Sequence, residues 1–168
     1  MAPRGLNQYA DHLSKIIDKN DWMVSLHLFY TLEQRWGPHT IDRMASSTNA
    51  ILPRYNSKFY DPQAEACNCF TQNWKGENNW VNPEFDCIAE CIQHCRSCQA
   101  SMAILVPYWL NMPWWSLLVD NNGHWRTFIV DVHWLNRQQN NFVPGKHGTL
   151  LGLAPPNFDM VALRCVFW

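Results

Sequence analysis

The fold is decided by the stretch Asn79-Trp80-Val81-Asn82-Pro83-Glu84-Phe85. Its first four residues form an apolar-polar run that reads as a short strand, and Pro83 stops it. A helix over 86–99 and a buried strand over 102–107 are expected to follow. Alternation of strands and helices across residues 39–132 predicts an α/β layer sheet.

Outside this unit the expected elements are mostly shorter. Apolar residues at helical spacing predict helices over 9–17 and 22–36, and Gly37-Pro38 ends the second. Strands are expected at 39–44, 127–132 and 161–167, with a short helix at 63–70 and a helical turn at 113–118. Residues 45–60 and 136–156 are rich in polar and turn-forming residues and are expected to be loops.

Composition limits the class of protein. The 168 residues include Lys+Arg 13 and Asp+Glu 14, so the net charge of −1 gives no global field for nucleic acid, although a local basic groove stays open. With 47% hydrophobic and 16% charged residues, the chain is able to bury a core. The most apolar stretch, 104–119, is broken by two prolines, whereas a membrane span needs about 20 consecutive apolar residues. We therefore expect no membrane partner.

The seven cysteines indicate the cellular compartment. Four of them crowd into residues 87–98, which is not the spacing of a secreted disulfide framework, and no secretory signal opens the chain. Both features predict an intracellular protein, nuclear or cytoplasmic. Along one helix Cys87 and Cys98 would lie about 16 Å apart, too far to share a zinc ion. Small buried thiols are the favoured interpretation, and a zinc site that includes Cys67 or Cys69 is the alternative.

Two strand ends offer candidate functional groups. The Asn82 amide oxygen and the Pro83 carbonyl can each accept a hydrogen bond, and Phe85 offers a flat face for a base. These groups could bind an exocyclic amine at the carboxyl edge of a sheet, where ligands bind in open α/β sheets. The same residues are also typical of an ordinary turn at the end of a strand. Asp42, at the end of the strand run Thr40-Ile41-Asp42, can bind a ribose or an amino group, or cap a turn.

Two further features are weaker. No glycine-rich phosphate loop follows Asp42, so a dinucleotide-binding fold with the usual fingerprint is not supported. The pairs Trp114-Trp115 and His124-Trp125 are able to stack on bases, although core or interface roles are commoner for such residues.

Taken in order, several runs resemble the polyprotein of DIRS-like tyrosine-recombinase retrotransposons. In those elements a reverse transcriptase and a ribonuclease H precede a region similar to phage-type DNA N6-adenine methyltransferases. The resemblance extends over nearly the whole chain, and its runs are 36–50, 52–57, 70–74, 76–83, 106–109 and 113–115.

The resemblance implies a domain organisation and a fold. Residues 1–20 would be a remnant of the ribonuclease H C-terminal helix, in which Asp11 matches a metal-binding carboxylate, and no nuclease activity is implied because the rest of that domain is missing. Residues 21–135 would form the methyltransferase-like α/β domain, and 136–168 a loop-rich C-terminal extension. The implied fold is a Rossmann-like methyltransferase sheet with flanking helices, preceded by two helices.

The resemblance also implies a function. The activity would be methyl transfer from S-adenosylmethionine to adenine N6, in single-stranded DNA or at a base flipped out of a duplex, with no metal site. The partners would be DNA and the other domains of the polyprotein. The implied catalytic residues are Asn82, Pro83 and Phe85, and the implied cofactor-binding residues are Asp42, Ala45, Asn49 and Asn68.

The chain departs from the family pattern at four positions. Glu84 replaces the second proline of the Asp/Asn-Pro-Pro-Tyr/Phe motif, Asn68 and Asn73 replace aspartates, and Met44 replaces an aromatic residue. These changes predict a degenerate copy with weak or no catalysis. The alternative is a non-catalytic nucleic-acid-binding or scaffold fragment of the polyprotein, and a third hypothesis is an incomplete fragment whose apolar surface needs a missing neighbour.

Overall fold

The computed structural model describes residues 22–144 and 158–168. The helix expected over 9–17, the ribonuclease H remnant assigned to residues 1–20 and part of the loop expected over 136–156 lie outside the described residues.

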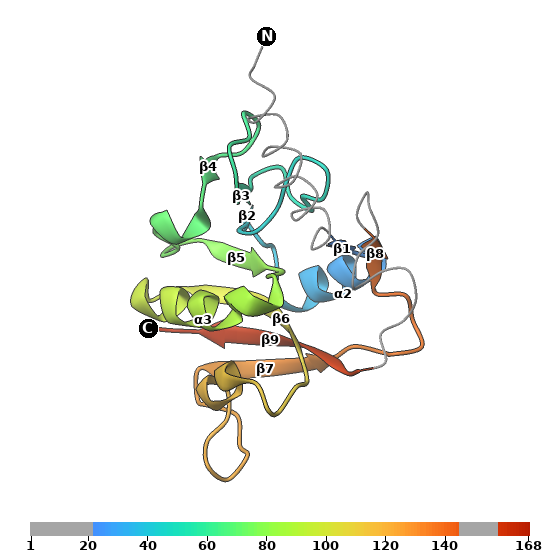
Figure 1. The fold of residues 1–168 in the computed structure, drawn as a ribbon, viewed down its shortest axis with the longest axis vertical. Helices are drawn as coiled ribbons and strands as arrows, with labels where there is room; N and C mark the ends of the chain where they lie inside the picture. The colour runs from blue at the N-terminus through green and yellow to red at the C-terminus, as the bar shows by residue number, and fades with distance from the viewer. Residues whose placement is uncertain (1–21, 145–157) are drawn as a thin grey trace, which may run out of the picture.

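A five-stranded mixed sheet forms the centre of the molecule (Figure 1). Its strand order is β2 (Ile41–Asp42), β5 (Asn78–Val81), β6 (Ser101–Pro107), β9 (Met160–Val166) and β7 (Ile129–Trp134). The first three strands are parallel, whereas β9 runs antiparallel to both of its neighbours. The predicted α/β class is confirmed as a mixed α/β fold.

Two apolar cores cover the two faces of this sheet. Along β6, Ile104 belongs to the core that includes α3 (Ile88–Ser97), while Leu105 belongs to the core that includes α2 (Leu26–Trp36). Successive side chains of a strand point to opposite faces. Because β6 is covered on both faces, its sequence reads as one continuous apolar run rather than as an alternating pattern.

The helix predicted over 22–36 begins later than expected. Ser25 is its N-cap and accepts a hydrogen bond from the Leu28 N–H at 3.2 Å, and α2 ends at Trp36, before Gly37. Residues Trp22–Val24 instead form β1, which pairs antiparallel with β8 (Phe142–Pro144). Trp22 and Val24 lie two positions apart, a spacing that fits a strand, but this short pattern merges into the helical one that follows.

The segments around the second strand also differ from the sequence prediction. The expected loop over 45–60 contains β3 (Asn56–Ser57), which pairs parallel with β4 (Ala66–Cys67). The helix expected over 63–70 is therefore replaced by β4 and a 3-10 turn, η1 (Cys69–Thr71). Two more 3-10 turns, η2 (Phe85–Cys87) and η3 (Pro113–Leu117), precede α3 and follow β6.

The C-terminal segment completes the sheet. The strand expected over 161–167 is present as β9, and it lies between β6 and β7. Residues that the sequence assigns to a loop-rich extension thus supply a buried strand of the central sheet. The stretch 136–156, which is rich in turn-forming residues, separates this strand from the rest of the sheet in the sequence, so local patterns do not predict its central place.

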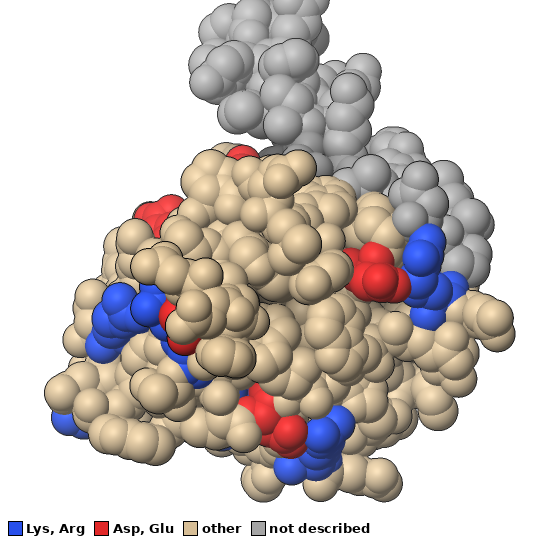
Figure 2. All heavy atoms as spheres, turned by 90° about the horizontal axis from the view of Figure 1, so that it is seen from below, with Lys and Arg blue, Asp and Glu red and all other residues tan. Residues whose placement is uncertain are grey.

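Surface charge is sparse and mixed. On the face shown in Figure 2, charged side chains of both signs are scattered singly and in small groups, which agrees with the net charge of −1. Within the described ranges, the chain has no helix with the length and apolar character needed to cross a bilayer.

Candidate functional site

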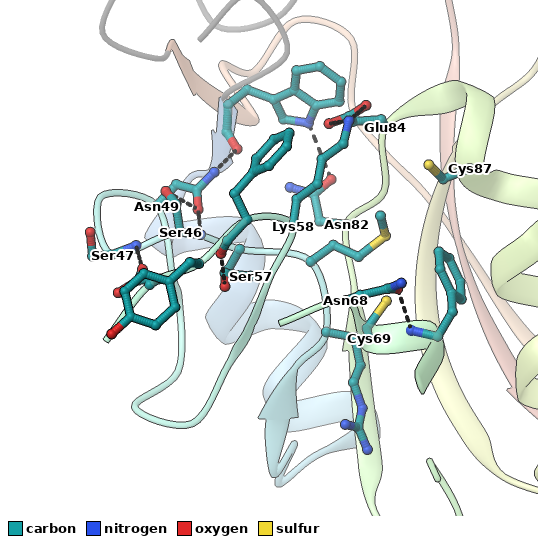
Figure 3. Close-up of a pocket in the computed structure, with 18 of the residues that line it drawn as sticks. Ser46, Ser47, Asn49, Ser57, Lys58, Asn68, Cys69, Asn82, Glu84 and Cys87 are labelled. Atoms are coloured by element: carbon teal, nitrogen blue, oxygen red, sulfur yellow. Dashed lines mark hydrogen bonds and ion pairs between the residues drawn. The ribbon is translucent and has the colours of Figure 1, made fainter. Parts of the chain in front are cut away.

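A cavity of about 740 Å³ opens beside the carboxyl ends of β2 and β5 (Figure 3). Its walls come from residues in four segments, 43–49, 57–62, 68–70 and 82–90, together with Trp22. A volume of this size lies in the range of small-molecule and cofactor sites. The two parallel strands bring the start of the first and last segments to one edge of the sheet.

The three residues of the predicted catalytic motif are placed differently. Asn82 lines the cavity, and its Oδ1 accepts a hydrogen bond from Trp22 Nε1 at 3.3 Å (Figure 3). Pro83 is buried beside it, and Phe85 packs its ring against Trp22 at 5.3 Å and Trp109 at 5.0 Å instead of lining the cavity. Of the three side chains, the one that can meet a ligand in the cavity is that of Asn82.

Asp42 lies beneath the cavity rather than in its wall. Its side chain is buried, with Oδ1 accepting from the Met44 N–H at 3.3 Å and Oδ2 from the Ile51 N–H at 3.2 Å. Burial raises the pKa of this carboxyl to about 7, against the two backbone hydrogen bonds, which lower it. Asp42 thus fixes both ends of the 43–51 loop, whose first half forms one wall of the cavity.

Ala45, Asn49 and Asn68, the other residues implied to hold the cofactor, all line the cavity. Asn49 Oδ1 accepts from the Ser46 N–H at 2.6 Å and so folds its own loop. Asn68 has a φ of 63°, in the left-handed region that asparagine tolerates better than most residues, and its Oδ1 accepts from the Phe70 N–H at 3.1 Å. Both asparagines therefore shape the walls as well as facing the cavity.

An ion pair that the sequence did not reveal lines the same cavity as Asn82. Lys58 Nζ lies 3.2 Å from both carboxylate oxygens of Glu84, and Figure 3 shows the three residues at the cavity. Lys58 belongs to the segment after β3 and Glu84 to the segment after β5, so the pair joins two walls of the cavity. The replacement of a proline by Glu84 was the available signal, whereas nothing in the sequence pointed to Lys58.

The backbone at Glu84 still suits the residue that the family pattern has there. Its φ of −58° lies within the range that a proline ring imposes. A proline therefore fits the backbone at this position, where the Glu84 side chain lines the cavity.

A comparison with protein families identifies the chain. A family model described as DNA N-6-adenine-methyltransferase (Dam) matches residues 12–151, which is more than half of the sequence. The chain belongs to this family. A comparison with curated proteins found no match.

The match to the Dam family confirms the methyltransferase-like part of the resemblance and implies DNA as the substrate of the family. It includes the cavity walls of the 43–90 region and the whole predicted catalytic motif. The retrotransposon context and the ribonuclease H remnant stay predictions.

The thiols at this Dam-family cavity are not activated. Burial raises the pKa of Cys69 to about 12 and that of Cys87 to about 11, so both are protonated at neutral pH and poor nucleophiles. Within the described part of the chain, the three potential ligand groups close enough to share a metal ion are those of Glu84, Asp86 and Cys87. Because this group contains one cysteine and neither Cys67 nor Cys69, it gives no support to the alternative of a cysteine zinc site.

Arg43 is a structural residue that the sequence did not reveal. Its guanidinium is buried under the cavity, where Nε donates to Asn79 Oδ1 at 2.7 Å and Nη1 to Asn56 Oδ1 at 2.8 Å. Burial lowers the pKa of this group from its ordinary value. Arg43 thereby ties the end of β2 to β3 and β5, the strands whose following segments line the cavity.

The aromatic pairs noted in the sequence have two different environments. Trp114 and Trp115 are buried in the core on the α3 face, so core packing accounts for them. Trp125 is half-buried and contacts Trp115 with ring centroids 5.8 Å apart, while His124 is exposed.

Proposed function

We propose that this chain transfers a methyl group from S-adenosylmethionine to N6 of adenine in DNA, in the cavity beside Asn82. The observation that carries the proposal is that Asn82, the first residue of the implied catalytic motif, has its amide in a cavity of about 740 Å³ within the Dam-family match. The proposed sheet is Rossmann-like, which is supported by three parallel strands with a cavity beside the carboxyl ends of two of them, β2 and β5.

The cavity has the chemistry that the cofactor needs. Ser46, Asn49 and Asn68 supply polar groups for a nucleoside, and Met44 and Phe59 supply apolar contacts. When bound, S-adenosylmethionine would supply an electrophilic methyl group on a positively charged sulfur, and its transfer to N6 would release neutral S-adenosylhomocysteine and one N6 proton to solvent. We assign its binding to Ala45, Asn49 and Asn68, while Asp42 acts through the loop that it fixes rather than by contact.

Asn82 and Pro83 would bind the substrate amine. The target adenine has to leave its stack to reach the cavity. The Asn82 Oδ1 and the Pro83 carbonyl would then accept hydrogen bonds from N6, which withdraws the nitrogen lone pair from conjugation with the ring. Catalysis by this arrangement rests on positioning and on dipoles fixed before the reaction, with no covalent intermediate. Phe85 supports the motif from beneath, through its ring contacts with Trp22 and Trp109.

The Lys58–Glu84 pair gives a reason for weak activity. It lines the same cavity as the Asn82 amide and places a negative charge where the family pattern has a proline. We therefore propose a degenerate methyltransferase domain, and we assign its origin to a DIRS-like retroelement on the sequence resemblance alone. Its further partners would be the other domains of that polyprotein.

Titration calorimetry with S-adenosylmethionine tests the cofactor, and transfer of a radiolabelled methyl group to adenine-containing DNA tests the reaction. We expect Asn82→Ala to bind the cofactor as the wild type does and to lose transfer about 100-fold, the usual cost of a removed stabilising group. Asn122→Ala, in an exposed turn, is the matched control and should keep full activity.

If titration of the wild type with S-adenosylmethionine released no heat at high protein concentration, the proposal that the chain binds this cofactor would be wrong. Quenching of tryptophan fluorescence by oligonucleotides without cofactor, and its loss with salt, would then favour the non-catalytic nucleic-acid-binding alternative.

A further inference from the structure

Trp22 contacts three of the residues assigned to the site, two from the segment 82–90 and one from the segment 43–49. Its Nε1 donates to Asn82 Oδ1 at 3.3 Å, and its ring lies 5.3 Å from that of Phe85. Its backbone carbonyl accepts from Asn49 Nδ2 at 3.3 Å. Trp22 also lines the cavity, although only 5% of its surface is exposed.

The hydrogen bond from Trp22 fixes which end of the Asn82 amide group carries the oxygen. The two ends of an amide have nearly the same shape, but only the oxygen can accept a hydrogen bond from an amine. An indole N–H is a donor only, so it pairs with the oxygen of Asn82 and not with the NH₂ group. The oxygen keeps its second lone pair for a ligand. An aspartate at this position would need no such partner, because its two oxygens are equivalent.

Trp22 is itself held in place by contacts of both its backbone and its side chain. β1 pairs with β8, with Trp22 opposite Pro144, and the Ser25 N–H donates to the Asn141 carbonyl at 2.8 Å. The Phe85 ring lies against Trp22 on one side and against Trp109, 5.0 Å away, on another. The indole is therefore fixed by strand pairing at its backbone and by ring packing at its side chain.

We propose that Trp22 is a positioning residue that sets the Asn82 amide with its oxygen available to the substrate amine. This role rests on the proposed function, since it matters for catalysis only if Asn82 binds that amine. In an aspartate form of the motif, either carboxylate oxygen can accept the hydrogen bond from the amine. In the asparagine form, the hydrogen bond from Trp22 ensures that the amide oxygen, and not the NH₂ group, faces the amine.

The geometry is tested first, without any need for activity, by NMR of the ¹⁵N-labelled indole groups. Loss of one signal in Trp22→Phe assigns the Trp22 N–H. We expect Asn82→Leu to shift that signal and to speed its exchange with solvent about tenfold, in line with the loss of one hydrogen bond. The indole signal lost in Trp109→Phe should stay unchanged in Asn82→Leu. An unchanged Trp22 signal in Asn82→Leu would overturn the proposal.

The positioning role is then tested by a double-mutant cycle on methyl transfer. Trp22→Phe should lower kcat about tenfold and leave KM for S-adenosylmethionine unchanged, whereas Trp134→Phe, at an exposed position of β7 that does not line this cavity, should change neither. In the Asn82→Asp background the loss caused by Trp22→Phe should fall to about twofold or less.

An equal loss in both backgrounds would show that Trp22 is only structural. If the wild type transfers no methyl group, the proposed function fails, while the indole signals still decide whether Trp22 holds the Asn82 amide.

Discussion

The segments that follow β2 and β5 leave the same edge of the sheet but use their polar groups in opposite ways. After β2, the Asp42 carboxylate is 3% exposed and both its oxygens accept backbone N–H groups. After β5, the Asn82 amide lies in the cavity. Position at the end of a parallel strand therefore does not by itself make a side chain functional. A side chain at this edge can bind a ligand only if its polar atoms are not already used in hydrogen bonds that hold the fold together.

The difference has a local cause. β2 consists of two residues, and the loop after it turns back under the cavity, so its backbone N–H groups need an internal acceptor. The chain after β5 passes through Pro83, which has no N–H group to satisfy, and then into the 3-10 turn η2. The side chain of Asn82 is therefore not needed to accept a hydrogen bond from the N–H group of the next residue.

The largest expected effect is on the buried support that the two segments share. Arg43→Met should lower the free energy of unfolding by about 3 kcal/mol, because it leaves the buried oxygens of Asn79 and Asn56 without donors. Arg54→Met is the matched control: that arginine pairs with Glu65 and Glu77 at the surface, and its loss should cost less than about 1 kcal/mol. Urea denaturation measures both, and equal costs would contradict the assignment of Arg43.

The buried carboxylate after β2 should show itself in the pH dependence of stability. The pKa of Asp42 is about 7 in the folded chain and near 4 when unfolded, so the folded state binds the proton more tightly and loses stability as the pH rises through this window. Asp42→Asn does not titrate, although it loses one backbone hydrogen bond at every pH. Its stability relative to the wild type should rise by about 2 kcal/mol from pH 5 to pH 8.

Asp61→Asn is the control for that measurement. The Gln63 N–H and the Tyr55 hydroxyl lower the pKa of Asp61, so this group titrates below the window and its replacement should give a difference that is constant from pH 5 to pH 8. A constant difference for Asp42→Asn as well would mean that Asp42 is ionised throughout and has access to water.

The smallest effect is expected after β5, where the side chains carry function rather than stability. Glu84→Pro fits the observed φ of −58° and should stabilise the chain by about 0.5 kcal/mol through the unfolded state. It should also strengthen cofactor binding, because it removes the Lys58–Glu84 ion pair from the cavity that the cofactor would enter. Lys58→Met removes the same ion pair and leaves the backbone unchanged, so it should share the gain in binding but not in stability. Weaker cofactor binding in both variants would show that the ion pair contributes to the site.

The sequence was informative where function depends on neighbouring residues and uninformative where it depends on distant ones. The run from Asn82 to Phe85 was recognised because its groups are contiguous, and the resemblance supplied Ala45, Asn49 and Asn68, which do line the cavity. Trp22 was assigned to a helix, since its role depends on the pairing of β1 with β8 about 120 residues later. Lys58 was missed for the same reason, because its partner Glu84 is 26 residues away.

Local patterns of apolar and turn-forming residues, which fix secondary structure and burial, predict an α/β layer around a buried central strand. The assignment of the strand-ending Asn-Pro run to a methyltransferase-like domain rests instead on the resemblance of several ordered runs to one family. Only the tertiary structure decided that Asp42 lies under the cavity, that Asn82 lies in it, and that Trp22 and Lys58 meet the motif. Contacts between distant segments depend on how strands pair and how cores close, and that information is spread over the whole chain.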